Sequence, residues 1–150
     1  MKPFTVLVPL LLVPVALAGG AEVPAPTPTL AITYHPSGGT LPFSDAVEVG
    51  NTLYLSGKVG TGADGKLVAG GVQAETRQVL DNIEASLERY GYARAHLVKC
   101  TVMLTDMQDF AAMNEVYGAW MVKPYPARST LGVSGLALGA SVEIECIAAK

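Results

Sequence analysis

The distribution of proline constrains the fold of this chain more than any other feature of its sequence. Eight of the ten prolines occur by Pro42, and the stretch from Phe43 to Lys123 contains none. Proline lacks a backbone donor and breaks helices and central strands, so a long proline-free stretch can form regular hydrogen-bonded structure. Residues 22–30 instead carry proline at alternating positions, which is typical of an extended linker. We therefore expect one folded domain over residues 31–150.

The first 21 residues have the layout of a secretory signal peptide. Lys2 supplies a positive start, an apolar stretch follows from Phe4 to Leu17, and residues 16–18 form a small-x-small cleavage site. A membrane anchor is the alternative, but the uncharged run is barely long enough to span a bilayer and prolines interrupt it. We therefore predict that residues 1–21 are removed, that the protein is exported to the periplasm or secreted, and that it has no stable membrane association after cleavage.

Composition and charge argue against several classes of protein. Half of the residues are hydrophobic and only 15% are charged, which excludes intrinsic disorder. The formal net charge is -3, and the basic residues are scattered, so we expect no nucleic-acid partner. The two histidines and two cysteines lie far apart in the sequence and match no metal-ligand spacing. We expect neither a metal nor another cofactor.

Hydrophobic periodicity predicts strands that alternate with helices. The turn-forming pair Gly50-Asn51 separates two alternating segments, as in a β-hairpin, and Gly91 ends a run of apolar residues at helical spacing. The predicted elements are a hairpin over 46–56, a helix over 72–90, a strand over 98–104, a helix over 106–123, and strands over 128–133 and 142–148.

This order predicts an α+β fold with a homo-oligomeric assembly. Each helix lies between successive strands, so both helices should cover the same face of one mixed sheet. Alternation then assigns six residues to the opposite face, and the surface they form is too apolar to leave in water. A homo-oligomer that packs these faces together would cover it. The six are Thr101, Met103, Thr130, Gly132, Ile147 and Ala149.

Six ordered segments of the predicted domain match motifs of one known family. They are Leu41–Ser44, Leu55–Lys58, Gln73–Ile83, Asp109–Tyr117, Pro126–Thr130 and Gly139–Ala148. On these segments, residues 31–150 resemble the Rid family, also called YjgF/YER057c/UK114, the reactive-intermediate deaminases. The resemblance implies a chorismate-mutase-like domain that forms a homotrimer with ligand sites in the clefts between subunits. It also implies hydrolysis of enamines and imines such as 2-aminoacrylate to 2-oxo acids and ammonia.

The resemblance also assigns roles to individual residues. Arg128 would hold the carboxylate of the small imino or 2-oxo acid ligand, and Glu143 would position or activate the attacking water. Two departures stand out, because many active members have tyrosine at the position of Phe43 and cysteine at that of Thr130. The residues that would line the substrate site are Phe43, Ser56, Asn114 and Thr130.

Each of these residues also has a purely structural interpretation. Arg128 could form an ion pair with Glu143 or Glu145, and such pairs could fix the register of the trimer. Asn114 shares a helix face with apolar residues, where a buried amide usually satisfies backbone groups. Ser56 lies at a strand end, where a hydroxyl more often bonds to backbone than acts as a nucleophile.

Cys100 and Cys146 should both point to the helix-covered face, since each alternates with apolar residues. The resemblance places their strands side by side, and an exported protein can form a disulfide there. Because cross-strand geometry is demanding, we expect two buried thiols.

His35 and His96 are expected at the surface.

Two functions of different classes therefore compete at this point. The first is a homotrimeric enamine/imine deaminase without a cofactor. The second is a non-catalytic small-ligand-binding or holdase-like trimer, which export favours because enzymes that generate 2-aminoacrylate are expected in the cytoplasm. A ribonuclease is disfavoured by the acidic charge and by the lack of a histidine pair.

Overall fold

The computed structural model describes residues 30–150, which contain the whole predicted domain. The predicted signal peptide over residues 1–21 lies outside this range, as does the linker over residues 22–30 apart from Leu30. Within the described range, no helix has the length and apolar character needed to cross a bilayer.

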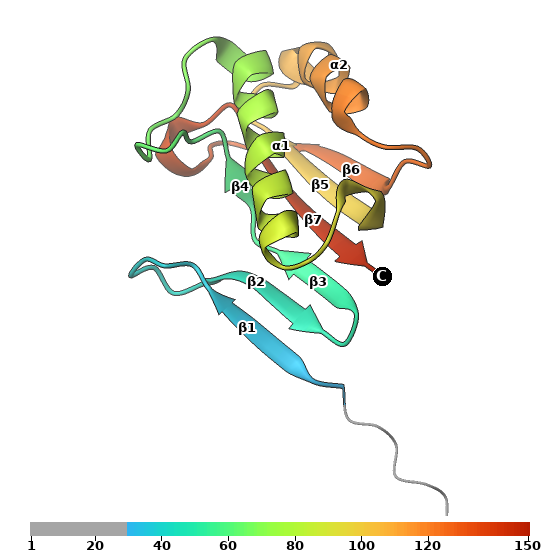
Figure 1. Cartoon of the computed structure of the whole chain (residues 1–150). Helices are drawn as coiled ribbons and strands as arrows, with labels where there is room; N and C mark the ends of the chain where they lie inside the picture. Colours follow the sequence, from blue (N-terminus) through green and yellow to red (C-terminus); the bar gives the residue numbers. More distant parts are fainter. Residues whose placement is uncertain (1–29) are drawn as a thin grey trace, which may run out of the picture.

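The described residues form one mixed sheet with two helices, as predicted (Figure 1). The strands lie in the order β1-β2-β3-β7-β5-β6, with β4 pairing to β7, and only β5 and β6 pair in parallel. The elements are β1 Ile32–Pro36, β2 Ser44–Val49, β3 Thr52–Leu55, β4 Lys58–Val59, α1 Gly71–Arg89, β5 Leu97–Leu104, α2 Phe110–Trp120, β6 Ala127–Gly132 and β7 Val142–Ala149.

Both helices cover the same face of the sheet, as predicted (Figure 1). Alternate residues of β5 and β7 are buried beneath them, and each fully buried large apolar side chain contributes about 1.5–3 kcal/mol. We call the opposite side of the sheet the open face. Side chains at the centre of the core include Val79, Leu80, Ile83, Leu87, Val102, Leu104, Val142 and Ile144.

Two predicted chain reversals are confirmed and have a clear cause. Gly50 adopts φ 58° in the hairpin turn, a conformation that side chains other than glycine disfavour. Gly91 adopts φ 76° after α1, where its N–H donates to the Glu88 carbonyl and the Tyr92 N–H donates to the Leu87 carbonyl. This pair of bonds is the Schellman motif, which ends the helix at the predicted position.

Two strands were not predicted from the sequence. β1 pairs with β2 at the edge of the sheet, and it lies close to several prolines, which disfavour a central strand. β4 has only two residues, too few to show an alternating pattern. Both histidines are partly exposed, in keeping with the expectation that they lie at the surface. His35 stacks on Tyr90 with ring centroids 4.1 Å apart, and Nδ1 of His96 accepts a hydrogen bond from the Ala93 N–H.

The predicted composition of the open face needs one correction. β6 pairs in parallel register with β5, so that Arg128 lies opposite Cys100 and Thr130 lies opposite Val102. Residues that lie opposite each other point to the same side of a sheet, so Thr130 and Gly132 point toward the helices. Ser129 and Leu131 take their places on the open face. The sequence alone did not show which residues of β6 lie opposite which residues of β5, and therefore which side chains of β6 face the helices.

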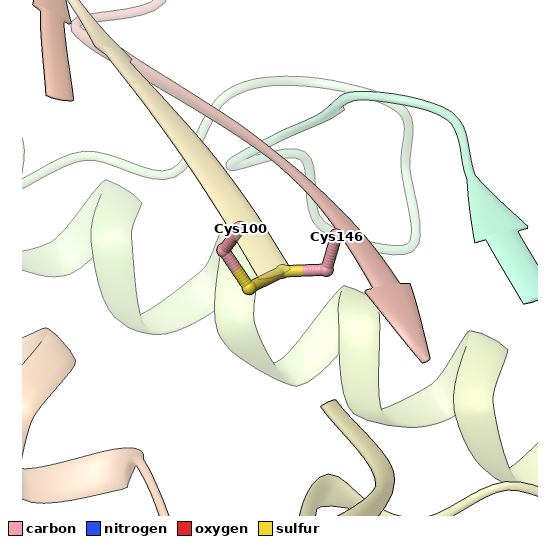
Figure 2. Close-up of a disulfide and its surroundings, with 2 residues drawn as sticks. All are labelled: Cys100 and Cys146. Carbon is pink, nitrogen blue, oxygen red and sulfur yellow. A yellow bond between two sulfur atoms is a disulfide. The ribbon is translucent and has the colours of Figure 1, made fainter. Parts of the chain in front are cut away.

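Cys100 and Cys146 form a disulfide in place of the two expected thiols (Figure 2). They lie directly opposite each other in the antiparallel β5–β7 pair, with their Cα atoms 4.1 Å apart. This separation resembles that of the closer type of antiparallel pair, where side chains approach each other most nearly. The helix-facing orientation of both residues is confirmed. The bond links the two central strands beneath α1.

Candidate functional site

Arg128 lies at the start of β6 on the helix side of the sheet, beside α2. Its Nη1 donates a hydrogen bond to Oδ1 of Asn114 at 2.9 Å. Its guanidinium carbon lies 4.7 Å from the ring centroid of Tyr117 and 5.8 Å from that of Phe110. These contacts come from one stripe of α2, because residues three and four apart share a helix face. Arg128 also lines a cavity of about 350 Å³.

The charge of Arg128 has no carboxylate partner among residues 30–150. The alternative ion pair with Glu143 or Glu145 is therefore wrong for the single chain. The interpretation of Asn114 as a buried amide is also wrong, because this side chain is exposed and binds the guanidinium instead of backbone. A planar guanidinium held on one side and open on the other suits a carboxylate ligand.

Glu143 lies in β7 on the open face, and Glu145 shares that face, as their spacing predicts. The Glu143 carboxylate lies against Gly57, where an added Cβ would collide with its Oε1. Burial raises the pKa of Glu143 above its ordinary value, and the negative charge of Glu145 raises it further. A carboxylate with a raised pKa suits a group that accepts a proton near neutral pH.

Ser56 directly precedes Gly57 in the chain, and Phe43 lines a cavity together with Gly57. The Ser56 hydroxyl donates a hydrogen bond to the Ser44 carbonyl at 2.6 Å, which confirms its bonding to backbone. Phe43 is half-exposed and lines a cavity of about 540 Å³ together with Gly57 and one face of α1.

A polar cluster borders the 540 Å³ cavity. The Asp45 carboxylate pairs with Lys58 and accepts a hydrogen bond from the Tyr90 hydroxyl at 2.7 Å. Burial opposes the charge of Asp45, but the hydrogen bonds from Lys58 and Tyr90 outweigh it and lower the pKa of this carboxyl. This cluster ties the end of α1 to the segment that carries Phe43.

The predicted site residues thus fall into two groups on opposite faces of the sheet. Arg128 and Asn114 lie beside α2, and Thr130 lies further along β6 on the same helix-covered side. Glu143 lies on the open face against Gly57, next to Ser56. One copy of the chain does not bring the two groups together.

The contact between the Tyr117 ring and Arg128 was not predicted from the sequence. Tyr117 is buried, and it lies seven residues after Phe110 on the same helix face. Its helical spacing from Asn114 was the available signal, since all three lie on one stripe of α2. In the described part of the chain, no group of three or more metal-ligating side chains gathers at either location.

Comparison with known proteins identifies the family of the chain. Residues 37–150 match the family described as Endoribonuclease L-PSP. The chain belongs to this family. It is 44% identical over 110 residues to a RutC family protein of Pyrococcus horikoshii, covering 73% of this chain and 87% of that protein. It is equally identical, over 110 residues, to a 2-iminobutanoate/2-iminopropanoate deaminase of Capra hircus, covering 73% of this chain and 80% of that protein.

Solved structures of Endoribonuclease L-PSP relatives share the fold. The crystal structure of RidA from an Antarctic Psychrobacter species matches 83% of this chain and 100% of its own, with TM-score 0.72 and 39% sequence identity. The resemblance to the Rid family and the α+β fold class are thereby confirmed.

Proposed function

We propose that this Endoribonuclease L-PSP family member hydrolyses reactive enamines and imines of the 2-aminoacrylate type to 2-oxo acids and ammonia. Relatives at about 43–44% identity carry the name 2-iminobutanoate/2-iminopropanoate deaminase. The observation that carries the proposal is Arg128, an oriented guanidinium that faces a cavity and has no carboxylate partner among the described residues. It suits a substrate whose reactive carbon is bonded to a carboxylate.

In the proposed reaction, the enamine first tautomerises to the imine. The substrate carboxylate binds Arg128, the imine nitrogen takes up a proton from solvent, and Glu143 accepts a proton from water as the water oxygen bonds to the resulting iminium carbon. Glu143 returns this proton to the nitrogen of the adduct, and the carbon–nitrogen bond breaks as the adduct's hydroxyl becomes the carbonyl. The hydroxyl proton leaves with the nitrogen as ammonium, and a 2-oxo acid remains. Holding a substrate that already reacts with water supplies most of the rate enhancement.

We infer that each active site forms between two copies of the chain, because Arg128 and Glu143 lie on opposite faces of one sheet. The open face supports association, since it exposes several large apolar side chains. A homotrimer is the assembly that we propose. Exposed apolar residues on this face include Ile32, Tyr34, Tyr54 and Leu131.

Mixing two inactive variants tests this arrangement. Arg128→Ala and Glu143→Gln chains are unfolded together and refolded in equal amounts. If each site takes Arg128 from one copy and Glu143 from another, random mixing restores about a quarter of the wild-type activity. Imines generated from amino acids by an amino-acid oxidase serve as substrates, and release of 2-oxo acid is measured. No restored activity in a correctly assembled mixture would contradict the shared site.

The alternative is a trimer that binds a small ligand without turning it over. Binding of pyruvate without hydrolysis of any imine by the wild type would favour it. The ribonuclease suggested by the family's description is disfavoured, because the two histidines pack separately against Tyr90 and the Ala93 backbone. No His pair is available for acid–base cleavage.

We also propose that the protein is exported after removal of residues 1–21. The disulfide supports this location, because disulfides persist in oxidising compartments. Mass spectrometry of protein from its native host should find a first residue near Gly19 or Glu22. An intact Met1 on material recovered from the membrane would contradict this proposal.

A further inference from the structure

The last turn of α2 contains a glycine that helix stability does not explain. Gly118 lies in the third turn of an eleven-residue helix, where glycine is the least favourable residue apart from proline. Close packing often requires a helical glycine, but that cause is absent here. Among residues 30–150, beyond its own helix backbone and chain neighbours, no atom lies within 4 Å of an ideal Cβ at Gly118.

The open space beside Gly118 belongs to the cavity of about 350 Å³ that Arg128 lines. This volume lies within the ordinary range of small-molecule sites. The charged end of the cavity is the guanidinium, which Asn114 holds by its hydrogen bond. The other lining residues are Tyr117, Tyr125 and Pro126, so Gly118 shares this cavity with aromatic and apolar side chains. Tyr125 is 56% exposed, which leaves its ring available for contact.

We propose that this cavity is the side-chain pocket of the substrate, and that Gly118 provides the room for an aromatic or bulky apolar group. The inference rests on the proposed binding of the substrate carboxylate by Arg128. It adds a substrate class, 2-imino acids with an aromatic or large apolar side chain. The amide oxygen of Asn114 already accepts from the guanidinium, and the rest of the lining is mainly aromatic and apolar, which favours such a side chain.

The chemistry of the walls supports an aromatic group in particular. Aromatic rings pack favourably against one another in edge-to-face or offset geometry. Tyr117 already lies beneath the guanidinium of Arg128, and Tyr125 lines the same cavity. A substrate with its carboxylate on Arg128 would therefore place a ring beside the two tyrosines, where the missing side chain of Gly118 leaves space.

A larger residue at position 118 tests the inference. Gly118→Leu fills the space with an apolar side chain and replaces glycine by a good helix former. Ala119→Leu is the matched control, because Ala119 is the next residue of the same helix, is exposed and does not line the cavity. Gly118→Ala gives an intermediate size. Light scattering checks the assembly of every variant.

Binding of two 2-oxo acids, measured by calorimetry, gives a readout that does not depend on turnover. We expect the wild type to bind phenylpyruvate at least about tenfold more tightly than pyruvate, since an apolar pocket discriminates by this order of magnitude. Gly118→Leu should weaken phenylpyruvate binding by about tenfold and change pyruvate binding by less than about threefold. Ala119→Leu should change neither.

Hydrolysis of imines made from L-phenylalanine and L-alanine gives the second readout. The same selectivity in turnover, lost in Gly118→Leu, is the expected result. Hydrolysis of both imines with no selectivity in the wild type, or equal losses for both in Gly118→Leu, would overturn the inference and leave the proposed function standing. Selective binding of phenylpyruvate without any hydrolysis would support the pocket and overturn the proposed function. A change of oligomeric state in Gly118→Leu alone would show that a second copy fills the space, and would also overturn it.

Discussion

Arg128 and Glu143 are both charged residues of the central sheet, but the fold treats their charges in opposite ways. Arg128 is oriented by the hydrogen bond that it donates to Asn114 and by two aromatic rings, and its charge stays available at the edge of a cavity. Glu143 lies beside Glu145, and both burial and that neighbour raise its pKa. The fold therefore leaves the guanidinium accessible and disfavours the charged form of the Glu143 carboxyl.

The difference separates two tasks of the proposed reaction. A permanent charge in fixed geometry suits recognition of a carboxylate, because a planar guanidinium forms two parallel hydrogen bonds. A carboxyl with a raised pKa suits transfer of a proton, because its two protonation states are closer in free energy near neutral pH. The two residues lie on opposite sides of one sheet, so in the proposed assembly a second copy brings the two tasks together.

The largest expected effect comes from cutting the covalent link between the central strands. The disulfide closes a loop of 46 residues, and the chain-entropy model predicts that its loss lowers the free energy of unfolding by about 4 kcal/mol. Urea unfolding with and without reductant, at fixed protomer concentration, measures this loss. The Cys100→Ala/Cys146→Ala variant is the control and should not respond to reductant. An identical midpoint for the reduced and oxidised wild type would contradict the prediction.

The next largest effect is expected from removing Arg128, the residue that we propose binds the substrate carboxylate. Arg128→Ala should lower kcat/KM by roughly 30-fold to 1,000-fold, about 2–4 kcal/mol, because a charge-assisted contact in a partly desolvated cleft is removed. Arg128→Lys should recover only part of the activity, since an ammonium does not reproduce the planar fork. Arg77→Ala, an exposed arginine of α1, is the matched control. Wild-type activity in a correctly assembled Arg128→Ala variant would contradict the proposed mechanism.

Glu143→Gln keeps the size of the side chain and removes the proton acceptor. Turnover should fall by about 100-fold, the lower end of the usual contribution of a general base, while binding of pyruvate changes little. Steady-state kinetics and calorimetry separate the two quantities. Dissociation of the oligomer by this substitution would instead support the role of Glu143 as an interface ion pair.

The smallest effect is a shift of the pH profile. The reactive form of Glu143 is the carboxylate, so activity should rise as the pH rises through its raised pKa. Glu145→Gln removes the neighbouring negative charge, lowers the pKa of Glu143 and should move this rise to lower pH. The wild-type rate profile is the reference. An unchanged profile in Glu145→Gln would show that Glu143 does not control the rate.

The contribution of Glu143 to the free energy of unfolding changes with pH in the opposite direction to its contribution to activity. Because the folded state binds the Glu143 proton more tightly than the unfolded state, this residue's contribution favours folding at low pH. It is lost as the pH rises from the ordinary glutamate pKa through the raised one. Glu143→Gln should remove that part of the pH dependence of unfolding.

Local signals predicted most of the fold, and long-range pairing explains the errors. The hairpin at Gly50 and the end of α1 at Gly91 depend on residues close in sequence, and both were predicted. The side on which Thr130 lies depends on its pairing with Val102, 28 positions away, and that register leaves no local trace. The disulfide similarly depends on how closely two strands approach.

The candidate site was predicted as residues but not as geometry. Family motifs identified Arg128 and Glu143, and their separation onto two faces followed only from the strand pairing. Gly118 gave no signal of its own, and the spacing of Tyr117 from Asn114 also has an ordinary interpretation as part of an apolar helix stripe.

The order of strands also determines which parts of the chain open first. β1 lies at an edge, pairs only with β2 and is largely exposed, whereas β5 and β7 are central and joined by the disulfide. Edge strands fray locally, while amides of a central pair exchange with solvent only when the whole domain unfolds. Amide hydrogen exchange should therefore be fastest in β1, next to the predicted linker, and slowest around Cys100 and Cys146. The pairing of β1 with β2 would therefore open long before the central strands, which carry Glu143, come apart.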